Sequence, residues 1–529
     1  MFNPSAVGHD AYDFLEGNVS DFYNAVDDAI VKSECVKGQY RISTSPAYNS
    51  TSPVKTPNFT TLGISSSGPI VVDLENSFIT AKPRITLSSS LGRADPTAAN
   101  HKPTKLFVGW KSAFEAIRQY DILVNSSPIY TQSFAGTESF IQDQILTELV
   151  KNTSPYTYTS YEEVKKMSPN VCGTYIDFTA AYAANTAITI EIPIKILLSQ
   201  FLIMKNLKYL CSWMGKWELR VYFNWENLVV APINPSLDLS SYDAYRATSS
   251  GTVGFTQIGD QFTGISEISV TAGVATVTTG NETVTVTSME THGVEVNLAT
   301  FQLRMDVNEE LKARYSDRPL TFPVSTFQIS RFSGAPNWGN AGSSLNTVLC
   351  QSVNNCDTVF ILFPKTPNER TVFRNPKLES LQLICGEFGA YPQQPINTSN
   401  DPKFLNMCGD ALNVNSSPLT SFNYDTANSF MDRTLIRTGA NADASRIFQL
   451  HDTSNFFVGI PFSIDDDFQG GLSSPSSNIN FKLMATATAD LREWQTPIIA
   501  CFLIDGSIMI KPDPMGETAR VIYTDRTIC

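Results

Sequence analysis

The residue types that most often perform chemistry in proteins are thinly spread along this chain of 529 residues. Its four histidines, His9, His101, His292 and His451, lie in separate segments, and none forms the HxH or HExxH spacing of a zinc site. The chain has neither a GxSxG nucleophile elbow nor a GxxxxGK[ST] phosphate loop. The sequence therefore predicts no catalytic residue, no cofactor-binding residue and no enzyme activity.

One acidic cluster has residue types suited to a hard cation. Asp465, Asp466 and Asp467 lie in the stretch SIDDDFQGG, and Ca²⁺ prefers carboxylate oxygens as ligands. The spacing is not that of an EF-hand loop, and adjacent carboxylates beside glycines are more often a solvated turn. We therefore predict no metal site, with calcium at these three residues as the alternative.

The composition of the chain limits the kinds of partner that the protein is expected to bind. A net charge of −13 without a run of basic residues argues against sequence-specific nucleic-acid binding, because phosphate contacts need clustered Lys and Arg. The nine cysteines form no CxxC pair, which favours reduced, mostly buried thiols. The start MFNPSAVGHDAYDF has no secretory pattern, and no apolar run reaches the length of a membrane span. We expect a protein that is made in the cytoplasm or nucleus.

Most of the secondary structure that the sequence predicts is β-strand. In residues 187–198, AITIEIPIKILL, isoleucine occupies every even position from Ile188 to Ile196, the alternation of a strand with one buried face. Pro193 interrupts this run and predicts an edge or bulge position, since proline cannot donate to a ladder. A second strand at 216–226 alternates in the same way. We predict the burial of eight side chains: Ile188, Ile190, Ile192, Ile194, Trp217, Leu219, Val221 and Phe223.

The strands fall into two groups, and few helices separate them. This pattern predicts an all-β fold with a few short helices, in which two antiparallel eight-stranded jelly rolls lie side by side. The expected limits are residues 68–235 for the first jelly roll and 293–529 for the second. Residues 236–292, rich in Val and Thr with a turn at Gly280–Asn281, are expected to form a β-hairpin insertion that projects from the body.

Residues 1–67 are predicted to form an N-terminal helix, at 10–32, followed by an extended arm. The helix is amphipathic and cannot bury its apolar face alone. We expect it to pack against a neighbouring subunit or another protein. The alternative is that it docks on the first jelly roll of its own chain.

Several stretches resemble one known family. VVDLENSFITAKPRITL opens the first strand group, and FGAYPQQP, NFFVGIPFSIDDDFQGG and IIACFLIDGSIMIKP follow in the second. Their order resembles that of double jelly-roll major capsid proteins, with virophages and Polinton-like viruses as the most similar members. The resemblance implies a homotrimeric, pseudo-hexagonal capsomer of an icosahedral double-stranded DNA virus. It also implies neighbouring capsomers, penton proteins and minor capsid proteins as partners and the virion as location, and it leaves contact with a membrane open.

A different class of function remains as the alternative. A β-sandwich of this kind can be a carbohydrate-binding or carbohydrate-active protein with an exposed aromatic cleft, and such a protein is expected to be a monomer or dimer. The six tryptophans are dispersed, however, and Trp217 and Trp225 fall on the apolar phase of a strand, as core residues do. Light scattering on the purified protein separates the two classes.

Overall fold

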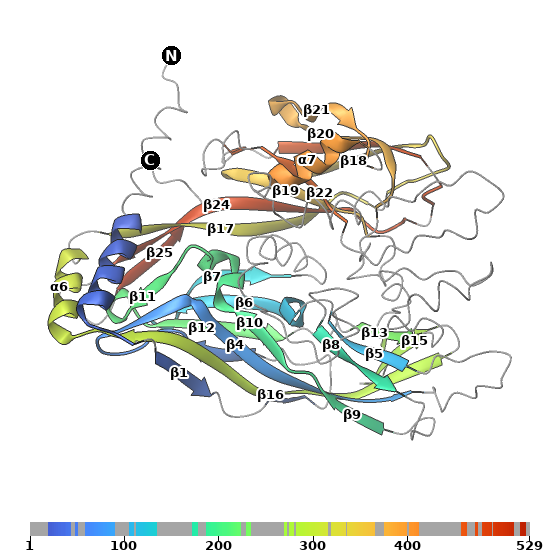
Figure 1. Ribbon diagram of the computed structural model, residues 1–529. Coiled ribbons are helices and arrows are strands. Elements are labelled where there is room, and N and C mark those ends of the chain that lie inside the picture. The colour runs from blue at the N-terminus through green and yellow to red at the C-terminus, as the bar shows by residue number, and fades with distance from the viewer. Residues whose placement is uncertain are drawn as a thin grey trace, which may run out of the picture.

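The computed structural model shows a molecule that consists mainly of β-strands (Figure 1). The structure describes only part of the chain. It describes residues 19–36, 38–43, 48–50, 59–89, 105–110, 113–134, 172–177, 187–223, 229–233, 269–271, 274–279, 282–315, 319–334, 336–364, 375–398, 401–411, 456–462, 471–473, 479–488, 490–492, 494–512 and 519–524.

The C-terminal half contains eight consecutive strands with the pairing of a jelly roll. Their bounds are β17 Leu320–Arg331, β18 Ser344–Gln351, β19 Cys356–Leu362, β20 Leu378–Cys385, β21 Ala390–Ile396, β22 Val458–Pro461, β23 Ile479–Ala487 and β24 Ile499–Lys511. The first pairs with the eighth, the second with the seventh, the third with the sixth and the fourth with the fifth, all antiparallel. Two sheets result, β17-β24-β19-β22 (the β24 sheet) and β18-β23-β20-β21 (the β23 sheet). This strand order is the double-sheet jelly roll.

The N-terminal half repeats this order with some strands divided. The first strand is β1 (Gly38–Ser43) with β2 (Tyr48–Ser50), and the sixth is β9 (Ala187–Glu191), β10 (Ile194–Leu197) and β11 (Tyr209–Cys211). The remaining strands in order are β3 Phe59–Gly63, β4 Ile70–Ser89, β6 Ile117–Val124, β7 Ser127–Ser133, β12 Trp217–Phe223 and β16 Glu282–Gln302. The β16 sheet again joins strands one, eight, three and six, and the β12 sheet joins two, seven, four and five.

The isoleucine run forms the sixth strand, and its proline lies where an edge is expected. β9 and β10 pair with β4 in one register, Glu191 opposite Arg84 and Ile194 opposite Ala81. Ile192 between them donates its N–H to the carbonyl of Pro83 at 2.9 Å. Because alternate residues of a strand direct their N–H groups to opposite sides, the missing N–H of Pro193 faces away from β4. Among the described strands, β9 and β10 form an edge of the β16 sheet.

The predicted burial is confirmed at seven of the eight side chains. All of them are buried except Ile190, which is half-buried against the same core. The two strands do not pair with each other, since β9 and β10 belong to the β16 sheet and β12 to the facing β12 sheet. Their apolar faces meet across the sandwich, where β12 shows strict alternation of buried and half-buried residues.

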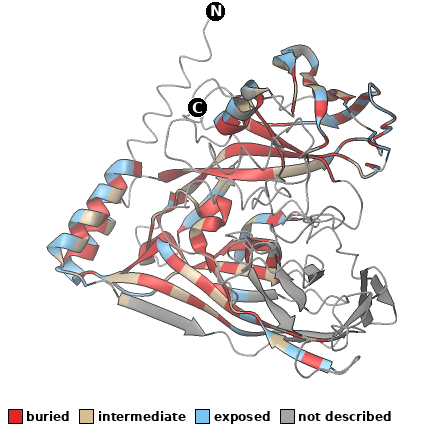
Figure 2. Ribbon diagram, turned by 45° about the vertical axis from the view of Figure 1, so that its right-hand side comes forward, coloured by how far each residue is buried: buried red, intermediate tan, exposed pale blue. Residues whose placement is uncertain are grey.

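The described residues form two hydrophobic cores, and two strands contribute to both. The second core lies between the β24 and β23 sheets. The first core fills the N-terminal sandwich and extends to Phe322 and Val324 of β17 and to Ile508 and Ile510 of β24. Figure 2 shows buried residues running through both layers and along these two long strands. The jelly rolls are therefore joined by continuous strands as well as by contact.

The structure differs from the extended arm expected within residues 1–67. This range contains β1, β2 and β3, the first two strand positions of the N-terminal jelly roll, paired with β16 and β12. Short segments such as GQYRIS and FTTLG have little periodicity of their own, and long-range pairing determines their conformation. The expected start of the second jelly roll at residue 293 falls inside β16.

The Val/Thr-rich range 236–292 contributes to the main sheet. β14 (Ser269–Thr271) pairs with β15 (Val274–Thr279), and β15 pairs with β16, Thr279 opposite Glu282. β15 and β16 thus form a hairpin within this range. Its second strand, however, continues into the body, because residues 284–292 of β16 pair with residues 82–89 of β4. A separate three-stranded sheet, β13 (Val229–Ile233), β5 (Lys105–Trp110) and β8 (Cys172–Asp177), accompanies these strands.

Candidate functional site

Most of the residues with catalytic or metal-binding potential lie outside the part of the chain that the structure describes. His292 lies in β16, whereas His9, His101, His451 and the triplet Asp465–Asp467 lie outside the described residues. Within the described ranges, no group of three or more His, Cys, Asp or Glu side chains could hold a metal ion. The calcium alternative at Asp465, Asp466 and Asp467 therefore stays a prediction.

The cysteines that the structure describes are free thiols, and most are buried. Burial raises the pKa of Cys385 and of Cys408 to about 12, so both remain protonated at neutral pH. A protonated thiol is a poor nucleophile and metal ligand. The buried thiols among them serve packing. Other candidate functional features in the described part are the surfaces at which the β-sandwiches meet.

One such surface is the seam between the two jelly rolls. In each jelly roll, strands five and six form neighbouring edges of the two sheets, here called the 5–6 edge. In the first jelly roll this edge consists of β7 and of the turns η2 (Leu198–Gln200) and η3 (Leu202–Met204), which lie between β10 and β11. The Gln200 side chain accepts a hydrogen bond from the Leu197 N–H at 2.9 Å and so holds the first turn.

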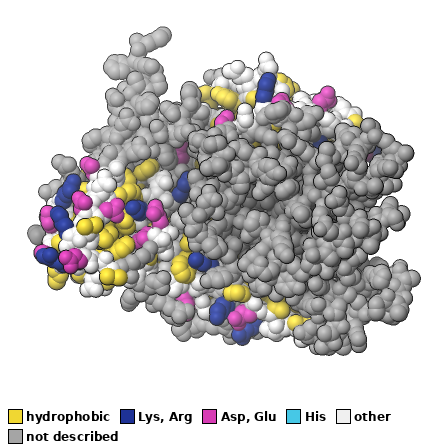
Figure 3. All heavy atoms as spheres, viewed as in Figure 1, with side chains coloured by type: hydrophobic (Ala, Val, Ile, Leu, Met, Phe, Trp, Pro, Cys, Tyr) yellow, Lys and Arg dark blue, Asp and Glu magenta, His cyan; other side chains and the backbone are white. Residues whose placement is uncertain are grey.

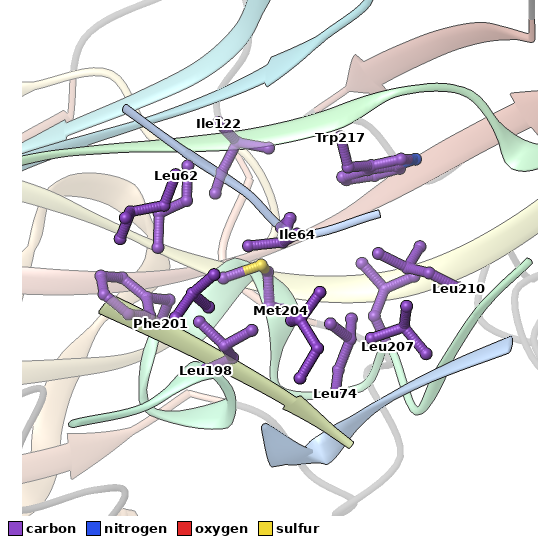
Figure 4. Packing of buried hydrophobic residues seen from close by; sticks show 14 of the residues in the cluster. Leu62, Ile64, Leu74, Ile122, Leu198, Phe201, Met204, Leu207, Leu210 and Trp217 are labelled. Atoms are coloured by element: carbon purple, nitrogen blue, oxygen red, sulfur yellow. The ribbon is translucent and has the colours of Figure 1, made fainter. Parts of the chain in front are cut away.

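These turns are packed on both sides. Leu198, Phe201 and Met204 point inward beneath Leu62, Ile122 and Trp217, as Figure 4 shows. Leu202 instead belongs to the second core, where Phe327 of the β24 sheet lies. A single apolar segment, SQFLIM, thereby closes the first sandwich and joins it to the second.

Polar and aromatic contacts extend the seam on either side of Leu202. Asn206 donates from Nδ2 to the carbonyl of Pro323 in β17 at 3.2 Å. The ring centroid of Tyr130 in β7 lies 5.2 Å from that of Tyr523 in β25 (Arg520–Thr524), a strand paired with β24. The Tyr523 hydroxyl is 3.1 Å from Thr326 Oγ1. The 5–6 edge of the first jelly roll thus docks on the outer face of the β24 sheet.

A buried carboxyl group lies at this seam. Asp505 of β24 accepts a hydrogen bond from Ser325 Oγ at 3.1 Å, and the half-buried Asp357 and Lys205 act on it electrostatically. Burial, together with the charge of Asp357, raises the pKa of Asp505 well above its ordinary value. Burial also lowers the pKa of Lys205, although Asp505 and Asp357 oppose that change. The signal in the sequence is a lone aspartate in the apolar strand IIACFLIDGSIMIK.

The N-terminal helix, residues 19–32, reinforces the same joint. Phe22 is fully buried, and its ring lies edge-on to Trp213, Tyr315 and Phe322 at 5.3 to 6.2 Å between centroids. Trp213 belongs to the first jelly roll, Phe322 to β17, and Tyr315 to the connecting helix α6 (Met305–Tyr315). Tyr209 donates from its hydroxyl to Asp27 Oδ1 at 2.6 Å.

The expectation that this helix packs against a neighbouring chain is therefore wrong. Its apolar face is buried on its own chain, at the end where α6 connects β16 to β17 (Figure 1). The reason is that α6 and the ends of β17 and β24 leave an apolar surface, and a helix of the same chain reaches it without a second molecule.

Three exposed apolar side chains lie at this end of the molecule: Val31, Val36 and Met305. Charged residues surround them, and an ion pair of 4.0 Å links Lys32 to Glu310. The left side of Figure 3 shows this mixture of hydrophobic and charged side chains over the two helices. A second set of exposed apolar residues, Val348, Met484 and Phe388, belongs to the β23 sheet and its β20–β21 connection.

The four sheets differ in how their faces are covered. In β24, both alternating sets of side chains are buried from Ile499 to Asp505, because the second core covers one face and the seam the other. In β18 and β23, buried and exposed or half-buried residues alternate along the whole strand. The outward-facing residues of β18 and β23 are thus exposed or half-buried among the described residues.

None of the helices in the described parts of the chain is long and apolar enough to cross a membrane.

No protein-family model matches the chain, and no curated protein matches it. Solved structures do. The chain is similar to a chain of the Sputnik virophage structure at 11% identity, over 92% of this chain and 88% of that one, with a TM-score of 0.44. It is similar to the major capsid protein of mavirus at 11% identity, over 92% and 91%, with a TM-score of 0.42.

The Faustovirus major capsid protein is similar at 10% identity, over 89% of this chain and 90% of that one, with a TM-score of 0.34. These are proteins of the kind that the sequence resembles. The assignment of the fold to this chain rests on its own strand order, which is that of a jelly roll in each half.

Proposed function

We propose that this protein is a major capsid protein, three copies of which form a pseudo-hexagonal capsomer of an icosahedral double-stranded DNA virus shell. The observation that carries the proposal is the presence of two jelly rolls with identical strand order, docked side by side in one chain. Three such chains supply six similar sandwiches, so a threefold ring has a nearly hexagonal outline.

The surface chemistry supports a structural role. Only 17% of the residues are charged, and the outward-facing residues of β18 and β23 are exposed or half-buried, as a surface that contacts further copies requires. In this proposal the protein is not an enzyme, and its partners are its own copies, neighbouring capsomers, penton proteins and minor capsid proteins. Its location is the virion, after assembly in the cytoplasm or nucleus of the host.

The strand order also supports a revised division of the chain. We place the first jelly roll at β1 to β16 and the second at β17 to β25, with α6 as the connection. The hairpin β14–β15 then belongs to the connection between strands seven and eight of the first jelly roll. In the capsomer we place this connection on the outer face of the shell.

The carbohydrate-binding alternative finds less support. The tryptophans whose side chains the structure describes, Trp213, Trp217, Trp338 and Trp494, are all buried. A sugar-binding platform requires exposed aromatic faces, and these four residues pack in the two cores instead.

Light scattering coupled to size exclusion tests the proposal. We expect a particle of three times the 58.2 kDa chain mass, with a hexagonal outline in negative-stain images. A permanent assembly of this kind should bury more than about 2,000 Å² per interface. A folded protein that stays monomeric at micromolar concentration would contradict the proposal, and a dimer with affinity for a glycan array would favour the alternative.

A further inference from the structure

The C-terminal strand β25 extends the β24 sheet toward the first jelly roll. Residues 507–510 of β24 pair with β17 on one edge and with β25 on the other, Ile508 opposite Tyr523 and Ile510 opposite Val521. β19 pairs with that second edge along residues 499–504. β25 therefore continues the edge beyond the end of β19, where β24 reaches the first core (Figure 1).

The two faces of this strand have different surroundings. Ala519 is a buried member of the first core, and Val521 and Tyr523 are half-buried against the same core. Arg520 and Ile522 alternate with them and are exposed. The segment therefore inserts one row of side chains into the first jelly roll, although its backbone pairs with a strand of the second.

The turn between β6 and β7 supplies a polar contact for this segment. Asn125 and Ser126 form the turn with φ values of 51° and 65°, as a type I′ turn requires. The Asn125 side chain accepts a hydrogen bond from the Lys216 N–H at 3.0 Å, and it donates from Nδ2 to the carbonyl of Ala519 at 3.0 Å. One side chain thus holds its own turn and binds the residue that precedes β25.

Tyr523 makes a second contact near the other end of the strand. Its ring centroid lies 5.2 Å from that of Tyr130 in β7, and its hydroxyl is 3.1 Å from Thr326 Oγ1 in β17. The ring therefore lies between the two jelly rolls. β25 is attached to the first jelly roll near both of its ends.

The attachment of β25 to β24 is weaker than that of the longer strands around it. The pairing covers five residues, and among the described strands β25 pairs with β24 alone. Lys511 lies opposite Arg520, and both side chains are exposed. Like charges at directly opposite positions weaken a strand pair. A short strand at the end of a chain also opens at a lower free energy than a strand in the core.

We infer that residues 519–524, here called the clasp, are a releasable strand, and that the β24 edge at residues 507–511 and the β6–β7 turn form a strand-binding site. When the clasp is docked, it holds β7 against the second jelly roll. The site takes an extended peptide with small or apolar side chains at alternate positions, as in ARVIYT. The inference concerns a single chain and does not depend on the proposed function.

Hydrogen exchange of the full-length protein, measured by mass spectrometry, tests the clasp. Tyr523→Ala removes one of its anchors. Asn125→Gly removes the side chain that binds it and keeps a residue suited to a positive φ. We expect each substitution to speed exchange by about 10-fold or more in the clasp and in β7, and to leave the β23 sheet unchanged. Ile522→Ala, on the exposed face of the clasp, is the control and should exchange as the wild type does.

A substitution with the opposite expected effect tests the attachment itself. Arg520→Glu places opposite charges across the pair with Lys511 and should slow exchange in the clasp by about twofold to fivefold. Because the side chain is exposed, this variant is expected to fold normally. Unchanged or faster exchange in the clasp of Arg520→Glu would contradict the inference.

A peptide of residues 519–524, added in excess, separates a binding site from a general loss of stability. In Tyr523→Ala the site is intact, so the peptide should restore slow exchange in β7. In Asn125→Gly the site itself is altered, so the peptide should have no effect. The inference is overturned if the peptide fails in Tyr523→Ala, if β7 keeps wild-type exchange in both variants, or if exchange rises equally throughout both jelly rolls.

Discussion

The two jelly rolls share one strand order but differ in the continuity of their strands. In the second, each strand position is a single segment, and β17 and β24 pair over twelve consecutive residues without a register shift. In the first, the first and sixth positions are divided into two and three segments, and β4 and β16 pair with three irregularities. The jelly-roll fold therefore depends on the order in which the strands pair, and a strand position can be divided into segments without a change in that order.

The interruptions lie where the first jelly roll makes its contacts. The gap between β10 and β11 holds η2 and η3, which carry Leu202 into the second core. The second jelly roll has at the same position β22 and the helix α7 (Pro402–Ala411), which packs on β22 through Ala411 near Gly459. The 5–6 edge of the first jelly roll thus forms part of the contact between the two halves of the chain.

The strongest test of the joint between the jelly rolls is Phe22→Ala. Because Phe22 is fully buried and contacts three aromatic rings from both halves, we expect a loss of about 3–5 kcal/mol in the free energy of unfolding, measured by urea titration. Val31→Ala on the exposed face of the same helix should change stability by less than about 0.5 kcal/mol. Equal stability of the two variants would contradict the docking of the helix on its own chain.

A pair of core substitutions asks whether the two halves unfold together. Ile192→Ala in the first core and Leu383→Ala in the second should each cost about 2–5 kcal/mol. Since β17 and β24 belong to both cores, we expect calorimetry to show a single transition shifted to lower temperature in either variant. Two separated transitions, one of which is unaffected by each substitution, would show that the jelly rolls unfold independently.

The raised pKa of Asp505 predicts that the stability of the protein depends on pH. A carboxyl group whose pKa is raised on folding stabilises the fold fully below its ordinary pKa, and this contribution is lost as the pH rises through the raised value. Asp505→Asn should therefore be more stable than the wild type at pH 8, on the order of 1–2 kcal/mol, with the difference vanishing near pH 4. Thermal melts across this range measure the effect.

Asp490→Asn is the control. Hydrogen bonds from Arg492 lower the pKa of Asp490, so its charged carboxylate stabilises the fold. Replacing this carboxylate should therefore lower the stability at pH 8 relative to the wild type, the opposite of the effect expected for Asp505→Asn. Lower stability of Asp505→Asn at pH 8 would mean that the charged carboxylate beside Lys205 strengthens the seam.

The smallest expected effect concerns a single hydrogen bond across the seam. Asn206→Ala removes the bond from Nδ2 to the carbonyl of Pro323 and should cost about 1 kcal/mol in unfolding free energy. Asn346→Ala, at an exposed position of β18, serves as the control. An unchanged unfolding midpoint in Asn206→Ala would show that this bond adds nothing to the joint.

Local patterning in the sequence determined which residues face the cores. Period-two alternation placed Ile188, Ile192 and Ile194 inward and identified Trp217 and Phe223 as core residues, because a strand directs alternate side chains to opposite faces. It also indicated two groups of antiparallel strands. Because proline has no backbone N–H to donate, the sequence also predicted an edge or bulge position for Pro193. These features follow from the residues themselves and their immediate neighbours.

Only the tertiary structure decided which segments complete the sheets and which surfaces meet. GQYRIS and FTTLG become strands by pairing with residues 295–300 and 218–222, far away in the sequence. Phe22, Leu202, Lys205 and Asp505 acquire their roles at the seam for the same reason. Their partners come from other parts of the chain, and a local pattern carries information about the face that a residue occupies but not about the element that covers it.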